Sequence, residues 1–210
     1  MIDIDYINDR FKDRKGTLIG NYKKAAVMIL LQEDSNGKVN VVFEVRSKKL
    51  KTQPMDVCLP GGRIEEGESP REAAIRETME ELMLQREDIE FIGDMDYLVT
   101  PYNLIMYVFL SKTSKENLSY SLDEVDHIFT VPLEFFINND PFLYNLKIGP
   151  IDKSGFPFHL INGGEDYKFR TGFLREYFYK YNGYVIWGFT AEIIKAFVDL
   201  IKNGIIWYNY

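Results

Sequence analysis

The sequence predicts an α/β fold, in which several strands are combined with a small number of helices. Short runs of β-branched and other apolar residues, bounded by turn residues, recur through the first half of the chain. Two further segments, residues 69–84 and 190–202, carry apolar side chains at helical spacing. The chain has 210 residues, which is enough for one domain with a buried core.

The first part of the chain predicts an arm followed by a β-hairpin. Residues 1–24 are polar and mixed, and we expect a short helix or an N-terminal arm there. Residues 25–31 predict a buried strand and residues 39–46 predict a second one. The dipeptide Asn36-Gly37 between them is a typical hairpin turn. A basic loop, residues 46–57, follows the hairpin.

Residues 69–84 have the clearest helix signals in the sequence. Ser69 is a good N-cap, Pro70 suits the first helical position, and Glu72 completes a capping box. At about 100° per residue, the apolar residues Ile75, Met79 and Leu82 fall within roughly 60° of each other and predict the face that packs on the core.

The opposite face of this helix is acidic. The projection, at about 100° per residue, places Glu77, Glu80 and Glu81 on this face. Ala73 projects between Glu77 and Glu80, and its small side chain leaves room for a ligand. Like charges at this spacing repel one another and destabilise the helix, and a bound cation would turn this repulsion into a net attraction. Carboxylates without nearby His or Cys suit a hard ion, so we expect Mg²⁺ or Mn²⁺. The alternative is an ordinary solvated acidic face.

The rest of the chain predicts further strands and a closing helix. Aromatic residues are dense after Phe129, and the region 137–183 shows no clear periodicity. An amphipathic helix is expected from Thr190 to Lys202, closed by Gly204. The other expected elements are strands over residues 88–100 and 103–111 and a short helix within 131–136. We expect residues 25–204 to form a single domain.

Composition and charge narrow the class of protein. The formal net charge of −7 disfavours nucleic acid as a partner but allows a small anionic substrate held by a metal or a few cations. A single cysteine, Cys58, cannot form an internal disulfide, which is typical of a reducing compartment. No apolar run is long enough for a membrane span, and the first residues do not resemble a signal peptide. We therefore expect a cytoplasmic protein without a membrane partner, and a homodimer is left open.

The acidic helix belongs to a longer pattern with fixed spacing. Gly62 is followed after five residues by Glu68, after seven more by Arg76-Glu77, and after two more by Glu80-Glu81. This pattern, from Gly62 to Leu84, resembles the box of the Nudix hydrolase superfamily, Gly-x5-Glu-x7-Arg-Glu-U-x-Glu-Glu-x-Gly-U, where U is a bulky apolar residue. Two positions depart from it.

Both departures lie in the second half of the predicted helix. Thr78 stands at an apolar position, and Met83 replaces the final glycine, which normally allows the helix to end sharply. The resemblance implies an α/β/α sandwich around a mixed sheet. It also implies Mg²⁺-dependent hydrolysis of a nucleoside diphosphate linked to another group, with Glu77, Glu80 and Glu81 as metal ligands.

A second motif resembles the coenzyme A pyrophosphatase branch of that superfamily. In that branch Arg-Ser is followed by Arg, Gly and Phe, each after three intervening residues, and Phe is followed directly by Pro-Gly-Gly. The register holds here from Arg46-Ser47 to Pro60-Gly61-Gly62, with Lys51, Met55 and Leu59 in place of the other three side chains. Residues 185–191 also resemble the segment that opens the last helix in the branch.

The branch resemblance implies cleavage of coenzyme A to 3′,5′-ADP and 4′-phosphopantetheine. Arg46 and Lys51, with the turn Gly61-Gly62, are the implied substrate-binding residues, although a solvated basic edge would explain the two cations as well. Trp187 is expected in the core rather than in a substrate site.

Three residues are assigned to catalysis: Arg76, Glu80 and Glu124. Arg76 is expected to position a helix carboxylate, since Glu72 and Glu80 lie one turn away on either side. Glu80 and Glu124 are the two candidates for the general base.

Two rival functions stay open. Pro101 and Tyr102 follow the box at about the distance where branches acting on ADP-ribose or dinucleoside polyphosphates carry a Pro or Tyr, and NADH belongs to the same group of alternatives. The other rival is a Nudix-fold protein that binds a nucleotide as a sensor without hydrolysing it. Retention of all three box glutamates disfavours the sensor.

Overall fold

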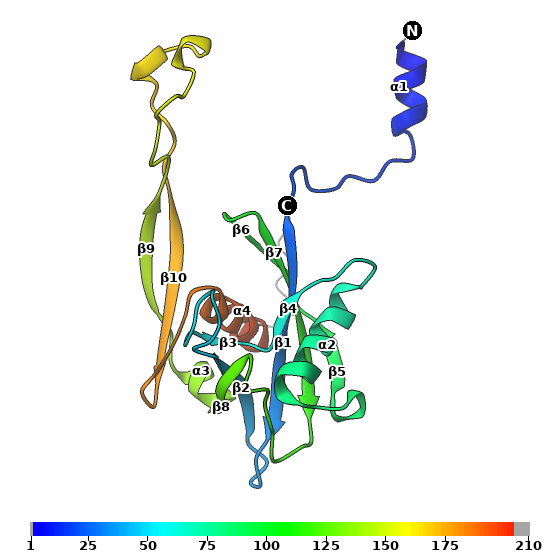
Figure 1. Ribbon diagram of the computed structural model, residues 1–210, viewed down its shortest axis with the longest axis vertical. Coiled ribbons are helices and arrows are strands. Elements are labelled where there is room, and N and C mark those ends of the chain that lie inside the picture. Colours follow the sequence, from blue (N-terminus) through cyan, green and yellow to red (C-terminus); the bar gives the residue numbers. More distant parts are fainter. Residues whose placement is uncertain (1, 204–210) are drawn as a thin grey trace.

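The computed structural model describes residues 2–203 and contains a mixed sheet, a smaller antiparallel sheet and four α-helices within that range (Figure 1). Their bounds in chain order are α1 (Ile4–Phe11), β1 (Lys23–Glu33), β2 (Val39–Arg46), β3 (Val57–Cys58), β4 (Gly61–Arg63), α2 (Pro70–Leu82), β5 (Glu90–Asp94), β6 (Leu98–Thr100), β7 (Leu104–Thr113), β8 (Val125–Pro132), α3 (Leu133–Asn138), β9 (Phe142–Ile148), β10 (Gly172–Tyr181), β11 (Tyr184–Trp187) and α4 (Gly188–Asn203). Three single-turn 3₁₀ helices, residues 86–88, 158–160 and 164–166, lie in the loops.

The larger sheet is mixed and centres on β1. Its main order is β3-β2-β1-β7-β5, with β4 paired to β1, β6 to β7 and β8 to β2. The β1–β7 pair is parallel over ten residues, and the other pairs are antiparallel. The predicted hairpin is confirmed, because β1 and β2 pair antiparallel around the Asn36-Gly37 turn.

Both faces of this sheet are covered, which confirms the predicted α/β/α sandwich. Successive side chains of β1 point to opposite faces: Met28 joins the core cluster under α2, whereas Ile29 joins the cluster under α3 and α4. Burial on both faces explains why residues 25–31 form a continuous apolar run instead of alternating with polar residues.

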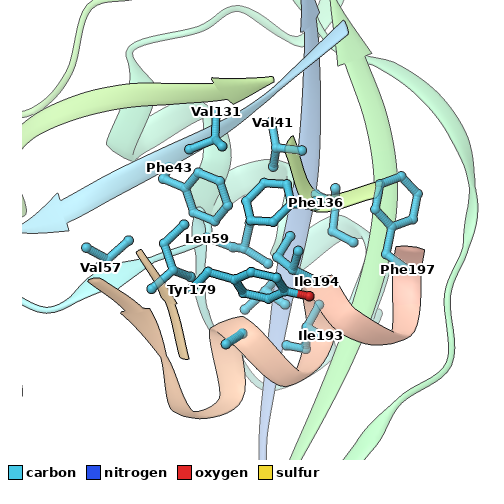
Figure 2. Close-up of a cluster of buried hydrophobic side chains, with 14 of the residues drawn as sticks. Val41, Phe43, Val57, Leu59, Val131, Phe136, Tyr179, Ile193, Ile194 and Phe197 are labelled. Atoms are coloured by element: carbon cyan, nitrogen blue, oxygen red, sulfur yellow. The ribbon is translucent and has the colours of Figure 1, made fainter. Parts of the chain in front are cut away.

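The core on the α4 side is rich in large aromatic and branched residues (Figure 2). Phe136 packs edge to face on Tyr179, with ring centroids 5.0 Å apart. Ile193, Ile194 and Phe197 cover them from α4. The expected amphipathic face of α4 is thus confirmed, whereas the expected stop at Gly204 lies outside the described residues.

Helix α2 begins and ends close to where the sequence predicts. The Ser69 hydroxyl accepts a bond from the Glu72 N–H, and the Glu72 carboxylate accepts one from the Ser69 N–H, so the capping box is formed. Met83 takes the left-handed conformation, with φ 49° and ψ 40°, that glycine normally adopts after a helix. The replacement of glycine therefore leaves the helix end in place, at the cost of a strained methionine.

The aromatic region after residue 137 contains strands that the sequence did not reveal. β9, β10 and β11 form a separate antiparallel sheet, and the β9–β10 hairpin stands away from the body of the molecule (Figure 1). Almost all of β9 is exposed on both faces, so no alternation of polar and apolar residues marks it as a strand. β8 was not predicted either, and α3 begins at Leu133, two residues later than expected.

The N-terminal arm contains the expected short helix. α1 has Asp3 as its N-cap and buries none of its side chains. Within residues 2–203, no helix is long and apolar enough to cross a membrane.

Candidate active site

Three carboxylates converge where α2 meets the start of β8. Glu77, Glu81 and Glu124 each offer an oxygen, and these oxygens lie within 4.8 Å of one another. The first two come from α2, and Glu124 comes from the turn before β8. The group does not include Glu80, which was predicted as a ligand.

Glu81 occupies a buried position, contrary to the helical projection. Its residue is 5% exposed, and its carboxylate accepts a hydrogen bond of 2.8 Å from the Gly61 N–H. Ala73, expected to leave room for a ligand, is fully buried in the core under α2. Helix α2 packs on both β1 and β4, so the buried part of its surface is wider than its apolar stripe.

Burial makes Glu81 hard to ionise without a cation. Desolvation raises its pKa to about 8, and the negative charges of Glu77 and Glu124 act in the same direction. The Gly61 N–H opposes this shift, because it stabilises the ionised form. Glu77, which is less buried, also has a raised pKa, again mainly through desolvation.

A fourth carboxyl group, Glu44, lies behind Glu81. It sits on β2, is 1% exposed, and its Oε1 atom has no hydrogen-bond partner. Burial raises its pKa well above the usual range, and so does the neighbouring Glu81. Sequence reasoning missed this residue, although a charged side chain between Phe43 and Val45 in an apolar strand is a signal of a functional or paired group.

Arg76 organises the acidic side of α2. Its guanidinium donates two bonds to the Glu68 carboxylate, at 2.9 and 3.1 Å, and bonds to Glu77 at 2.9 Å and to Glu80 at 3.2 Å. The pKa of Arg76 is raised, chiefly by the bonds to Glu68. Glu72 is not a partner, because its carboxylate caps the helix. The Glu80 side chain remains 56% exposed at the edge of this network.

The two glycines of the predicted turn have different roles. A Cβ on Gly61 would lie 2.3 Å from the Ala26 carbonyl oxygen, and its φ of +145° favours glycine. The backbone of β4 can therefore approach β1 only with glycine here. A Cβ on Gly62 would instead lie 2.4 Å from the Glu77 carboxyl carbon, so this glycine makes room for the acidic group.

Glu124 is held in place by the backbone around it. The Ser121 N–H donates to the Glu81 carbonyl at 2.8 Å, and the Ser47 N–H donates to the Glu124 carbonyl at 2.8 Å. These two bonds tie the turn before β8 to the end of α2 and to the end of β2. The Glu124 side chain itself is exposed.

A cavity of about 820 Å³ lies next to the glycine turn. Four cationic side chains line it, of which sequence reasoning found only Arg46: Lys23, Lys24, Arg46 and Arg63. Lys51, the other predicted contact, is exposed and does not line the cavity. Lys49 instead pairs with Asp123 at 3.1 Å.

Aromatic side chains form another part of the cavity wall. Tyr102 packs edge to face on Phe189, with centroids 6.2 Å apart, and Trp187 is 40% exposed there. The expectation of a core position for Trp187 is therefore wrong. Cys58 also lines the cavity, but desolvation raises the pKa of its thiol, which disfavours the thiolate that a nucleophilic cysteine needs.

The donor set fits a hard divalent cation. Three carboxyl groups converge, and the buried Glu44 beside them has an oxygen without a partner, so the group offers more acceptor oxygens than the neighbouring donors satisfy. His and Cys ligands, which would favour zinc, are not part of the group.

Comparison with known proteins identifies the family. The NUDIX domain model matches residues 22–146, which is more than half of the chain. The chain therefore belongs to the NUDIX domain family. The match ends within β9, before most of the protruding hairpin.

Two curated relatives belong to one branch. The peroxisomal coenzyme A diphosphatase NUDT7 of Mus musculus is 35% identical over 130 residues, covering 58% of this chain and 51% of the relative. The peroxisomal coenzyme A diphosphatase ndx-8 of Caenorhabditis elegans is 31% identical over 119 residues, covering 55% of this chain and 51% of the relative. The chain thus spans about half the length of these curated relatives.

A solved structure supports the fold. The crystal structure of a MutT/nudix family protein from Enterococcus faecalis matches with a TM-score of 0.50 and 15% identity, covering 96% of this chain and 70% of that one.

Proposed function

We propose that this protein hydrolyses the diphosphate bond of coenzyme A or its derivatives in a Mg²⁺-dependent reaction, releasing 3′,5′-ADP and 4′-phosphopantetheine. The observation that carries the proposal is the convergence of Glu77, Glu81 and Glu124 beside a cavity lined by cations. The similarity to two coenzyme A diphosphatases supports this substrate over other diphosphates.

The acidic residues divide into two groups in this proposal. Glu77, Glu81 and Glu124 would hold Mg²⁺ or Mn²⁺, which when bound lowers the pKa of a water and offsets negative charge on the phosphates. Arg76 is a positioning residue, because it fixes the Glu77 carboxylate from the side. Gly61 does the same for Glu81 through its N–H. Glu80 has no oxygen among the converging carboxylates, so it stands outside the proposed ligand set.

Glu80 and Glu124 remain the two candidates for the general base. If Glu124 takes the proton of the attacking water, Glu124→Gln should lower kcat by about 10²–10⁴-fold at saturating Mg²⁺ with little change in metal affinity. If Glu124 serves only as a ligand, the same variant should lose metal affinity and recover activity at high Mg²⁺. Loss of kcat in Glu80→Gln, with Glu124→Gln active, would assign the base to Glu80.

Arg46 is the cation best placed to contact the anionic substrate. It lines the cavity, and its charge favours ionisation of both Glu44 and Glu81, so it lies near the acidic group. Removal of one charge-assisted contact costs roughly 1.5–3 kcal/mol, or about one to two powers of ten in kcat/KM. We expect this loss for Arg46→Ala and no comparable loss for Lys51→Ala, which removes an exposed cation of the same loop.

Product analysis with Mg²⁺ and a substrate panel tests the function itself. The panel contains coenzyme A, dephospho-coenzyme A, ADP-ribose, NADH and diadenosine polyphosphates. Preferred cleavage of coenzyme A supports the proposal, and a stronger effect of Arg46→Ala on coenzyme A than on dephospho-coenzyme A would place Arg46 at the 3′-phosphate.

A second candidate function is hydrolysis of ADP-ribose, NADH or a dinucleoside polyphosphate. It is favoured by Tyr102, which lines the cavity and is 64% exposed, because an exposed aromatic ring can stack on a base. A tenfold preference for one of these substrates over coenzyme A would replace the first proposal. Binding without turnover of any substrate would favour the nucleotide sensor.

A further inference from the structure

The β9–β10 hairpin extends beyond the support of its own sheet. β11 pairs with β10 only over Phe178–Tyr181, whereas β9 pairs with β10 over Gly172–Phe178. Nearly the whole length of β9 therefore belongs to a two-stranded ribbon, which stands clear of the larger sheet (Figure 1). An isolated ribbon of two strands is marginally stable in water, and a third or fourth strand is usually needed.

The outer edge of β9 lacks the usual protection against pairing. Its seven residues pair with β10 in a regular register without a bulge, and Lys147 is its only charged residue. Four apolar side chains are exposed along it: Phe142 (66%), Leu143 (43%), Tyr144 (55%) and Leu146 (43%). Edge strands that must stay single are normally short, charged, bulged or interrupted by proline.

The far end of the hairpin is stiffened by its own aromatic cluster. Phe169 lies between Phe156 and Tyr167, with ring centroids 5.2 and 5.1 Å away, and Phe156 packs on Phe158 at 4.9 Å. The ribbon is thus closed at its root by β11 and at its tip by these rings. It presents a preformed edge, for which pairing costs little additional conformational entropy.

We propose that the β9 edge pairs with β9 of a second copy of this chain, giving a two-fold homodimer in which the two three-stranded sheets join into one continuous six-stranded sheet. Pro141 and Pro150 bracket the strand, so full pairing of residues 142–148 places Asn145 opposite Asn145 on the two-fold axis. Directly opposite residues share a face in antiparallel pairs. This register therefore brings Tyr144 of each copy beside Leu146 of the other.

The area available agrees with a weak but specific dimer. A fully buried aromatic side chain contributes roughly 150–250 Å², so complete coverage of the exposed parts of the four apolar residues and of the backbone between them would give at most about 600 Å² per copy. The total of about 1,200 Å² is the lower limit for a specific interface. We expect a dissociation constant in the micromolar range. The inference is independent of the proposed function.

Sedimentation velocity of the full chain from 1 to 100 μM tests the proposal. The wild type should shift from monomer to dimer across this range. The double variant Leu143→Lys/Leu146→Lys puts like charges on both faces of the edge and should stay monomeric. Ile92→Lys is the matched control, because Ile92 is 48% exposed on β5, the edge strand of the other sheet. It should dimerise as the wild type does.

A cysteine on the two-fold axis gives a second readout that does not depend on a destabilising change. Asn145→Cys should form a disulfide-linked dimer under mild oxidation, whereas Lys147→Cys should not, because residue 147 lies opposite residue 143 of the other copy in this register. A wild type that remains monomeric at 100 μM would overturn the proposal. A dimer that persists in the double lysine variant, or that gives no cross-link at position 145, would move the interface elsewhere.

Discussion

Gly62→Ala separates the role of Gly62 at the site from any role in the fold. The added Cβ would lie 2.4 Å from the Glu77 carboxyl carbon and 2.5 and 2.6 Å from its two oxygens. The φ angle of Gly62 is not positive, so alanine fits the backbone of β4. The clash falls on the end of a flexible side chain, which can move. The substitution therefore displaces the Glu77 carboxylate and leaves the strand unchanged.

The required movement is large compared with the tolerance of a metal site. Ordinary contact begins near 3.4 Å, so the carboxylate must move by about 1 Å, which also breaks its 2.9 Å bond from Arg76. Metal–ligand distances vary by only about 0.2 Å. We expect the divalent-metal affinity to fall roughly 10–100-fold, or about 1.4–2.7 kcal/mol. Stability without metal should change by less than about 1 kcal/mol.

Calorimetric titration with Mn²⁺ or Mg²⁺ measures the affinity, and thermal unfolding with and without metal measures the stability. Gly93→Ala is the matched control, because its Cβ meets nothing within 4 Å and Gly93 lies on β5, away from the site. It should bind metal as the wild type does.

Two results would contradict this reasoning. Wild-type metal affinity in Gly62→Ala would show that Glu77 is no ligand, or that its carboxylate has room to bind from another position. A loss of several kcal/mol of stability without metal would show that Gly62 is required by the strand, as we expect for Gly61.

Three further predictions concern stability. Burial raises the pKa of Glu81 from 4.5 to about 8, so between these pH values the metal-free folded protein binds more protons than the unfolded chain. The free energy of unfolding should therefore fall as the pH rises from about 5 to 8, by up to a few kcal/mol. Urea unfolding at several pH values checks this, and a flat profile would refute it. Glu81→Gln should flatten the profile, abolish the stabilisation by Mg²⁺ in thermal melts and abolish hydrolysis; near-normal activity would exclude Glu81 as a ligand. Met83→Gly should stabilise the protein by up to about 1 kcal/mol in urea unfolding, because glycine adopts the left-handed backbone conformation without strain and the Met83 side chain is 57% exposed. A loss of more than about 1 kcal/mol would show that the methionine side chain makes stabilising contacts with the rest of the fold.

Local signals in the sequence were enough for the central elements of the fold. Capping by Ser69 and Glu72 and the Asn36-Gly37 turn depend on a few neighbouring residues, so the structure agrees with them closely. The β9–β10 hairpin could not be found in this way. Its exposed strands show no burial pattern, and its aromatic residues pack mainly on one another.

For the site, the sequence by itself determined the acidic helix and the glycine turn, because spacing along one chain segment carries both. It could not determine which carboxylates meet. Glu124 and Glu44 reach Glu81 only through the pairing of β2 with β8 and the packing of α2, and Glu80 lies outside the converging group. The helical projection misplaced Glu81 because it assumed that apolar residues alone define the buried face. Only the tertiary structure shows that the N–H of Gly61, twenty residues earlier, makes that burial tolerable for a carboxyl group.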